Sequence, residues 1–503
     1  MEKYTEQEII RRESLNKLKA LGINPYPANE YKINTTSRKV KSDFSEEKGE
    51  QKKIILAGRI MSRRIMGKAS FVEIKDADGR IQIYVNRDEI CPLEDKTMYN
   101  EVFKKHLDIG DIIGVEGCVF RTKVGEISVR AKKITILSKS IKPLPIVKKD
   151  SEGKTFDAFK NTELRYRQRE LDLIVNDDSW LVFEKRTQIV NYIRKQLNKQ
   201  GYIEVETPIL QPIAGGAAAK PFITHHNTLD VPLYLRIANE LYLKRLIVGG
   251  KTGVYEFAKD FRNEGMDKTH NPEFTMLEFY VAYKDYNWMM VFVEKLLQGL
   301  VEHVCGKTKI QYGSNEINYK GPYKKIPFFQ AIKDATGEDV SKMTEKELQK
   351  YCRLKNIEID NSMGRGKLFD AVFGEFCEKK LIQPTYIINY PIEMSPLTKK
   401  HRNEEGLTER FELFINGKEI ANAYSEQNNP IEQRKSFEEQ AKLSNRGDDE
   451  AMLIDGGFLR ALEYGMPPTS GIGIGMDRLT MLLTNKQSIQ DVLFFPQMKP
   501  EKK

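Results

Sequence analysis

Two runs of the sequence contain residue types suited to nucleotide chemistry. The first, FRNEGMDKTHNPEFTMLEFY, extends from Phe261 to Tyr280, and the second, GIGIGMDR, extends from Gly471 to Arg478. The arginines could pair with phosphate oxygens, and an arginine or an aromatic ring could stack on a base. Acidic side chains beside them could pair with a cation. Together the runs predict a site for a triphosphate, an adenine and a cationic substrate.

The common nucleotide-binding signatures are absent from the sequence. It contains no GxxxxGK[ST] and no strand-linked GxGxxG. Gly471, Gly473 and Gly475 alternate with isoleucines, which is the periodicity of a strand. Alone, such glycines more often indicate tight strand packing than a ligand site. The MDR and the helical LTMLLTN that follow favour a ligand site, where glycines let the ligand approach the backbone.

The run ERFELFINGKE is a candidate for binding a divalent metal. Glu412 and Glu419 lie on two strand-like halves separated by a turn at Asn416-Gly417, so a hairpin could bring both carboxylates together. Mg²⁺ prefers such oxygens, together with phosphate and water. The alternative is a pair of exposed strand carboxylates beside basic neighbours, and the residues alone favour that alternative.

The first part of the chain predicts a β-barrel. Short β-rich runs separated by turn signals begin at Ile54, a helix is expected over 99–106, and Pro143 closes the unit. Five short strands in about 90 residues predict a small closed barrel of the OB type. Before it we expect an amphipathic helix that ends near Gly22, followed by a polar linker or loosely packed segment at 29–52.

The rest of the chain predicts an antiparallel sheet flanked by helices. A strong helical pattern extends over 179–199, and a strand broken by Pro208 follows it. Hairpins rather than regular βαβ units come next, which favours an α+β fold with a mostly antiparallel sheet. We expect a helix and linker over 1–52, the OB barrel over 53–145 and a connector over 146–178. The catalytic domain is expected over 179–503, with a helical insert at about 330–382.

Composition excludes several classes of protein. The 503 residues allow at least two domains, and the net charge of +9 suits a polyanionic partner without proving one. The five cysteines are widely spaced without a CxxC pair, and the six histidines form no spaced cluster. This disfavours a structural zinc site or a disulfide framework, and fits the reducing cytoplasm. No stretch reaches the roughly 20 apolar residues of a membrane span, and the N-terminus lacks a signal-peptide core.

The two runs resemble motifs 2 and 3 of the class II aminoacyl-tRNA synthetases. The helix at 179–199 with its strand and proline resembles motif 1, which forms the dimer interface in that family. The resemblance extends from about Ile54 to Pro500, and the surrounding residues resemble the lysine-specific members. It implies activation of L-lysine with ATP to lysyl-adenylate and pyrophosphate, then transfer of lysine to the 3′ end of tRNA(Lys), by a homodimer that binds no membrane.

The resemblance assigns roles around ATP. Arg262 would contact the α-phosphate and the substrate carboxylate, Glu264 would bind the adenine amino group, and Phe274 and Arg478 would stack on opposite faces of adenine. The two arginines would supply the catalytic charge stabilisation, without a side-chain general base. About three Mg²⁺ ions would accompany ATP. The remaining residues implied near the phosphates and their metal ions are His270, Asn271, Glu412, Glu419 and Gly475.

The resemblance also implies a pocket for the amino acid. Three carboxylates suit a cationic side chain, because a buried ammonium group must be paired. The residues implied to face lysine are Gly216, Glu240, Arg262, Glu278, Tyr280, Asn422, Tyr424 and Glu426. An aspartate enzyme would need a cation at the base of the pocket, and these runs indicate none. In the RIAxE run the family usually has proline where this chain has Asn239, which could alter the turn before Glu240.

In the barrel, the resemblance implies recognition of the anticodon. Arg64, Phe71, Gln82 and Glu126 fall where the family contacts a U-rich anticodon. OB surfaces bind single strands through basic grooves and aromatic stacking. The alternatives are core packing for Phe71 and a solvated charged surface for the others.

Two other functions stay open at this point. One is an aspartate- or asparagine-type class II synthetase, which has the same barrel and catalytic layout. The acidic pocket argues against it. The other is a non-catalytic RNA-binding paralogue, and the presence of both arginines and both metal-binding glutamates argues against that.

Overall fold

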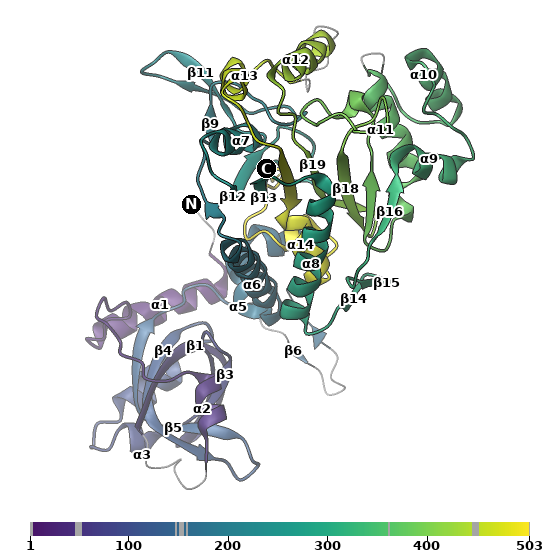
Figure 1. The fold of residues 1–503 in the computed structure, drawn as a ribbon. Helices are drawn as coiled ribbons and strands as arrows, with labels where there is room; N and C mark the ends of the chain where they lie inside the picture. Colours follow the sequence, from purple (N-terminus) through teal and green to yellow (C-terminus); the bar gives the residue numbers. More distant parts are fainter. Residues whose placement is uncertain are drawn as a thin grey trace. The chain divides into compact units, whose positions relative to one another are not determined.

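The computed structural model describes residues 4–45, 53–145, 148–149, 155–156, 159–360, 363–444 and 452–501. The chain divides into two compact units, residues 1–160 and 161–503 (Figure 1). The predicted divisions at residues 52 and 146 lie outside the described residues.

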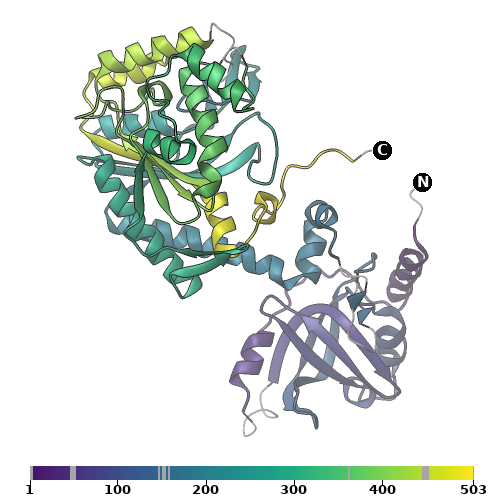
Figure 2. The same ribbon diagram turned by 90° about the vertical axis from the view of Figure 1, so that its right-hand side faces the viewer.

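The first unit is a closed barrel with strand order β1-β2-β3-β5-β4 (Figure 2). In β3, Ile81, Ile83 and Val85 are buried and alternate with partly exposed residues. Because successive side chains point to opposite faces of a strand, this alternation fills the barrel interior. The predicted OB-type barrel is confirmed. Its elements are α1 (Glu6–Ala20), α2 (Ser37–Asp43), β1 (Lys53–Met66), β2 (Ala69–Lys75), β3 (Arg80–Asn86), α3 (Arg87–Ile90), η2 (Met98–His106), β4 (Ile112–Arg121), β5 (Ile127–Ser138), β6 (Lys148–Lys149) and β7 (Thr155–Phe156).

The expected helices of this unit are present. Thr5 caps α1, and the buried Arg11 donates a hydrogen bond to the carbonyl oxygen of Ile109 at 2.9 Å, which ties the helix to the barrel. The helix expected over 99–106 is η2, a π-helix.

The segment at 29–52, expected as a linker or loosely packed segment, forms neither helix nor strand over 29–36 but contains a helix after that. Residues 37–43 form α2, in which Val40 is buried. The ring of Tyr31 packs so closely on Gly114 that a Cβ there would lie 2.2 Å from Tyr31 Cζ. These few apolar contacts are spaced too irregularly to produce a recognisable period in the sequence.

The second unit contains an eight-stranded sheet in the order β16-β17-β18-β19-β20-β13-β12-β8. Among the described strands of this sheet, only the outer pairs β16/β17 and β12/β8 are parallel, so the predicted mostly antiparallel sheet is confirmed. Its elements are α4 (Thr162–Arg167), α5 (Arg169–Val175), α6 (Asp177–Lys199), β8 (Ile203–Glu204), β9 (Leu210–Gln211), β10 (Ile223–His226), β11 (Val231–Leu235), α7 (Glu240–Val248), β12 (Gly253–Phe261), β13 (Glu273–Ala282), α8 (Tyr286–Cys305), β14 (Lys309–Tyr312), β15 (Asn315–Asn318), β16 (Lys324–Pro327), α9 (Phe328–Thr336), α10 (Glu345–Leu354), α11 (Arg365–Phe376), η3 (Glu378–Lys380), β17 (Thr385–Ile388), η4 (Ile392–Met394), β18 (Arg410–Ile415), β19 (Lys418–Ser425), α12 (Pro430–Ser444), α13 (Gly456–Glu463), β20 (Thr469–Gly475), α14 (Met476–Thr484) and η5 (Ile489–Asp491).

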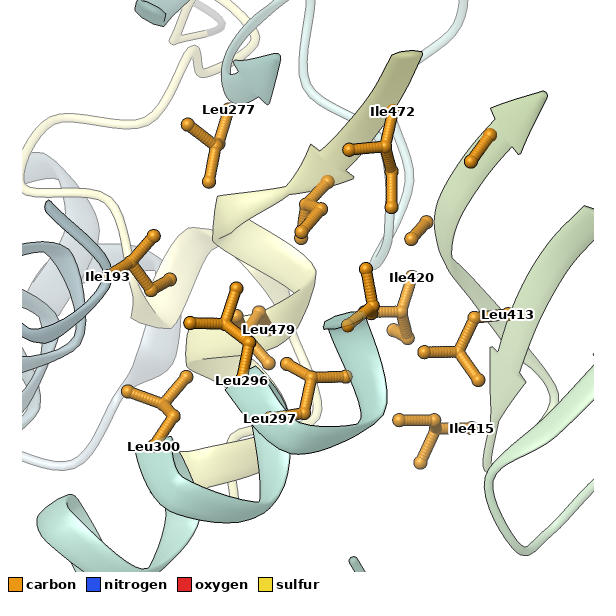
Figure 3. Packing of buried hydrophobic residues seen from close by; sticks show 14 of the residues in the cluster. Ile193, Leu277, Leu296, Leu297, Leu300, Leu413, Ile415, Ile420, Ile472 and Leu479 are labelled. Carbon is orange, nitrogen blue, oxygen red and sulfur yellow. The ribbon is translucent and has the colours of Figure 1, made fainter. Parts of the chain in front are cut away.

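Helices α6, α8 and α14 pack against one face of this sheet (Figure 1). Figure 3 shows Leu296, Leu297 and Leu300 of α8 facing Leu479 of α14 and Ile420 of β19, and all five are buried. Burying one leucine side chain stabilises a fold by about 1.5–3 kcal/mol. This core leaves the opposite face of the central strands available for polar side chains.

The segment expected as a helical insert contains α9, α10 and α11. It has a separate apolar cluster, in which Phe328 stacks on Phe373 with ring centroids 5.1 Å apart. Among the described residues, no helix combines the length and the apolar character that crossing a bilayer requires.

Candidate active site

A cavity of about 810 Å³ lies beside the central strands of the sheet in the second unit. It collects most of the residues that the sequence predicted for a nucleotide and amino-acid site. Those that line it are Gly216, Glu240, Arg262, Glu264, His270, Asn271, Phe274, Glu278, Tyr280, Glu419, Asn422, Tyr424, Gly475 and Arg478. Glu412 and Glu426 are not among its lining residues.

Strand register explains the alternating glycines of β20. Gly471 lies between Tyr280 of β13 and Tyr424 of β19. A Cβ at Gly471 would lie 2.2 Å from both Tyr280 Cε1 and Glu426 Oε1. The absence of a side chain at Gly471 therefore leaves room for the side chains of Tyr280 and Glu426. Such room is required both for tight strand packing and for access of a ligand to the backbone.

In the lining of the cavity, an arginine covers an aromatic ring. The guanidinium carbon of Arg262 lies 5.1 Å from the ring centroid of Phe274. The backbone N–H of Arg262 donates to the carbonyl oxygen of Pro272 at 2.8 Å, which closes the loop between β12 and β13. An arginine and an aromatic plane are thus held together where a phosphate and a base could bind.

The second arginine is anchored by two segments. Arg478 Nη1 donates to the carbonyl oxygen of Glu419 at 2.8 Å, and Arg478 Nη2 lies 3.0 Å from His270 Nε2. The preceding residue, Asp477, accepts the backbone N–H of Thr275 at 2.7 Å and pairs with Arg186 at 2.6 Å. These contacts hold the start of α14 against β13, so the two sequence runs form one site.

The two glutamates predicted to bind a metal lie on a hairpin, as expected. Its turn has positive φ at Asn416 (51°) and Gly417 (67°), which matches the expected Asn-Gly turn. Arg410 and the hydroxyl group of Tyr390 donate hydrogen bonds to Glu412.

Burial raises the pKa of Glu412 to about 7, against the effect of Arg410, and the carboxylates of Glu419 and Asp370 add to the rise. A divalent cation would relieve this repulsion. No group of three acidic, histidine or cysteine side chains in the described parts of the chain could hold a metal ion alone. Two carboxylates could hold Mg²⁺ only with further oxygen ligands, such as those of phosphate and water.

A buried lysine pairs with two of the three acids expected to face the substrate, although the sequence indicated no cation near the pocket. Lys244 is fully buried, and its Nζ lies 2.5 Å from Glu240 Oε1 and 2.9 Å from Glu426 Oε2. The hydroxyl group of Tyr424 donates to the other oxygen of Glu240 at 2.6 Å. Glu426 thus lies behind the cavity wall as a partner of Lys244.

The third carboxylate, Glu278, faces the cavity with a different set of partners. Tyr280 donates to it at 2.9 Å, and Glu278 forms no ion pair with any residue that the structure describes. Burial raises its pKa well above the usual range, and the nearby carboxylates of Asp260 and Glu240 raise it further. Burial also raises the pKa of Glu426 to about 8, although Lys244 opposes the shift. A bound cation would favour the ionised form of Glu278.

Asn239, the departure from the family pattern, takes part in a buried network. Its Nδ2 donates to Glu256 Oε2 at 2.9 Å, and Arg236 pairs with the other oxygen of Glu256 at 2.7 Å. Glu240 still begins α7 directly after it and lines the cavity. The asparagine therefore does not displace Glu240 from the site.

Comparison with known proteins identifies the family. Residues 161–499 match the family model described as tRNA synthetases class II (D, K and N), and residues 54–137 match the model of an OB-fold nucleic acid binding domain. The chain belongs to the class II tRNA synthetases.

Three relatives of this class II synthetase cover nearly the whole chain, and each is a lysine–tRNA ligase. The protein from Porphyromonas gingivalis is 61% identical over 99% of this chain and 86% of its own length. The protein from Christiangramia forsetii is 60% identical over 100% of this chain and 88% of its own. The protein from Azobacteroides pseudotrichonymphae is 58% identical over 99% of both.

The barrel of this synthetase places the predicted anticodon residues on two strand pairs and a turn. Arg64 and Phe71 are partners across β1 and β2. Gln82 accepts a hydrogen bond from Ser128 at 2.8 Å, and Glu126 pairs with Lys41 at 3.4 Å. Phe71 is partly exposed, and its ring lies 5.3 Å from that of Tyr84, so it is not part of the barrel core.

Sequence reasoning missed two basic residues of the site. Lys244 follows Glu240 by four residues, the spacing at which helical side chains meet, so a signal for this pair was present. Arg410 lines the cavity and donates to Asn422 Oδ1 at 3.1 Å as well as to Glu412. No local signal distinguished Arg410 from an exposed strand arginine.

Proposed function

We infer that the protein is a lysine–tRNA ligase, which activates L-lysine with ATP and transfers it to tRNA(Lys). The observation that carries this inference is Glu278, an acid on the cavity wall without a basic partner among the described residues. Lys244 occupies the other two acids of the pocket, so Glu278 is the group available to an incoming ammonium. The names of the three relatives support the same substrate.

The proposed lysine subsite places its polar groups around one end of the cavity. Glu278 and Tyr280 would receive the side-chain ammonium, because a buried cation must be paired and hydrogen-bonded. Gly216, with φ of 88°, brings its backbone to the cavity wall, and Glu240, Asn422 and Tyr424 complete the lining. Glu426 acts on the subsite through Lys244.

The proposed ATP subsite uses the two arginines. Phe274 and Arg478 would hold the adenine, Glu264 its amino group, and Arg262 the α-phosphate. The side chains of His270 and Asn271 would lie near the outer phosphates, and Gly475 admits the ligand to the backbone. Arginine suits these positions because its planar group binds phosphate oxygens in pairs and stacks on rings.

The reaction then proceeds in two steps. A carboxylate oxygen of lysine attacks the α-phosphorus, the bond to the bridging oxygen breaks, and pyrophosphate leaves with lysyl-adenylate still bound. The 3′-hydroxyl group of tRNA attacks the activated carbonyl carbon, loses its proton, and AMP leaves. Arg262 would stabilise the charge that develops at the α-phosphate, and positioning supplies much of the remaining rate. No protein nucleophile is needed.

Glu412 and Glu419 would hold Mg²⁺ with the phosphates of ATP. The raised pKa of Glu412 supports this assignment, because the nearby carboxylates of Glu419 and Asp370 add to the rise and a cation would favour their ionised forms. A Mg²⁺ ion held there would supply positive charge that offsets the negative charge of the phosphates. Arg410 and Tyr390 orient the Glu412 carboxylate toward that role.

The barrel would bind the anticodon of tRNA(Lys), and the whole enzyme would act as a cytoplasmic homodimer. Partly exposed Phe71 and exposed Arg64 supply the stacking and charge that single strands need. For the dimer, Trp180 and Leu181 at the start of α6 are 44% and 53% exposed. Apolar side chains exposed together suit a subunit contact.

The decisive experiment is ATP–pyrophosphate exchange with purified protein and Mg²⁺, run separately with each of the twenty amino acids. We expect exchange with lysine alone, followed by charging of tRNA(Lys). Exchange with aspartate or asparagine would refute the proposed pocket. Absence of exchange with every amino acid would instead favour the non-catalytic paralogue.

A further inference from the structure

We propose that Asp267 is a positioning residue that fixes the tautomer of His270 and thereby the place of Arg478. Asp267 lies in the loop between β12 and β13. No role was predicted for it from the sequence, and it is not among the residues that line the cavity. The inference rests on the proposed ATP subsite, to which His270 and Arg478 belong. It adds the residue that determines how these two side chains meet.

The direction of two hydrogen bonds carries the argument. Arg478 Nη2 lies 3.0 Å from His270 Nε2, and a guanidinium group can only donate. His270 Nε2 must therefore accept, which places the ring proton on Nδ1. His270 Nδ1 lies 2.9 Å from Asp267 Oδ2, which accepts that proton. Only this tautomer satisfies both contacts.

The carboxylate of Asp267 is itself held in place by its own loop. Its Oδ1 accepts the backbone N–H groups of Thr269 at 2.6 Å and His270 at 2.8 Å, and the hydroxyl group of Thr269 at 2.9 Å. Partial burial opposes its ionisation, but the hydrogen bonds from His270 and Thr269 outweigh it and hold the pKa of Asp267 well below the usual range. The group is thus a fixed acceptor.

The loop is anchored to the rest of the site. The backbone N–H of Ile489 donates to the carbonyl oxygen of Lys268 at 2.8 Å. On the other side, Arg478 Nη1 donates to the Glu419 carbonyl oxygen at 2.8 Å. The guanidinium group is therefore held through both of its terminal nitrogens, by Glu419 and His270, which restricts its rotation.

The opposite tautomer of His270 would remove one of these points. With the proton on Nε2, the ring would direct an N–H group at the N–H of Arg478, and the guanidinium group would have to move. Asp267 prevents this because its carboxylate can only accept. The plane of Arg478 matters because this side chain is proposed to stack on adenine.

The variant Asp267→Asn should change the tautomer of His270 while leaving the conformation of the loop intact. The amide oxygen of asparagine can still accept the backbone N–H groups of Thr269 and His270, so the turn persists. Its NH₂ group would face His270 Nδ1, which then has to accept, and the proton would move to Nε2. Glu273→Gln is the matched control, because it removes one negative charge nearby, from a residue whose ion pair is with Lys259 at 3.4 Å.

The first measurement is the ¹⁵N spectrum of selectively labelled histidine side chains in the ligand-free protein at pH 8, where an unperturbed imidazole is neutral. Only six histidines contribute, and the signals missing from His270→Asn identify those of His270. We expect the proton on Nδ1 in the wild type and the Glu273→Gln control, and on Nε2 in Asp267→Asn.

The second measurement is ATP–pyrophosphate exchange with lysine. Loss of one oriented hydrogen bond should raise the KM for ATP about fivefold to tenfold in Asp267→Asn, while the KM for lysine changes less than about twofold. An unchanged tautomer overturns the proposal, and so does an inverted tautomer with an unchanged KM for ATP. Failure of the ATP subsite itself would be recognised separately, since Arg478→Ala would then also leave the KM for ATP unchanged.

Discussion

Lys244 Nζ lies 2.9 Å from Glu426 Oε2, although the two residues are 182 positions apart in the sequence, and both side chains are fully buried. The same ammonium group binds Glu240. The pocket thus consists of an internal cation with two carboxylates and a third carboxylate, Glu278, that faces the cavity. The substrate ammonium would complete a balanced arrangement of charges.

Removing the internal cation should destabilise the second unit. Lys244→Met keeps the length of the side chain and leaves Glu240 and Glu426 buried without their partner. Breaking a buried ion pair in this way costs about 3–5 kcal/mol. We expect a lower midpoint in urea unfolding, and partial recovery in the double variant Lys244→Met/Glu426→Gln. A single variant as stable as the wild type would contradict the ion-pair assignment.

Arg262 should be required for adenylate formation and not for folding. Its guanidinium group covers Phe274 and makes a long contact, 3.5 Å, to the Ile237 carbonyl oxygen. We expect Arg262→Ala to lower the rate of ATP–pyrophosphate exchange at least about 100-fold, as removal of a charge-stabilising donor does. Circular dichroism should be unchanged. Normal exchange in this variant would contradict the assignment of Arg262 to the α-phosphate.

Lysine binding should weaken as the pH falls. The pKa of Glu278 is raised by burial and by the neighbouring acids, so the group takes up a proton at a higher pH than an ordinary glutamate. Because only the ionised form can pair with the ammonium of lysine, the KM for lysine should rise as pH falls through that raised pKa, with the KM for ATP less affected.

The variant Glu278→Gln also tests whether Glu278 is the partner of the substrate ammonium. The amide cannot ionise, so we expect a higher KM for lysine, a smaller change in the KM for ATP, and loss of the pH dependence of the KM for lysine. Equal losses for both substrates, or a pH profile like that of the wild type, would argue against Glu278 as the partner of the substrate ammonium.

Phe71 should affect tRNA charging without affecting lysine activation. Its ring lies beside Tyr84, and Tyr84 lies 5.9 Å from Phe120, so three aromatic rings form a row on the barrel. Stacking of a base on such a ring contributes about 1–3 kcal/mol. We expect Phe71→Ala to raise the KM for tRNA(Lys) about tenfold, with ATP–pyrophosphate exchange unchanged. Unchanged charging would place anticodon recognition elsewhere.

The sequence predicted elements whose cause is local. Alternating apolar residues over a few strands predicted the barrel, and helical spacing over 179–199 predicted α6. The Asn-Gly pair predicted the turn between β18 and β19, because both residues there need positive φ. The packing within 29–45 was not predicted, since it depends on Tyr31 meeting Gly114 and leaves no periodic pattern.

The sequence by itself determined the residue types of the site and the antiparallel character of the sheet, because motifs and periodicities are local properties of the chain. Only the tertiary structure decided which charges pair. It placed Lys244 between two acids that had been assigned to the substrate. It also placed Glu412 where Arg410 and Tyr390 donate hydrogen bonds to its carboxylate. Ion pairing depends on distances of a few ångströms between segments far apart in sequence, and folding alone sets those distances.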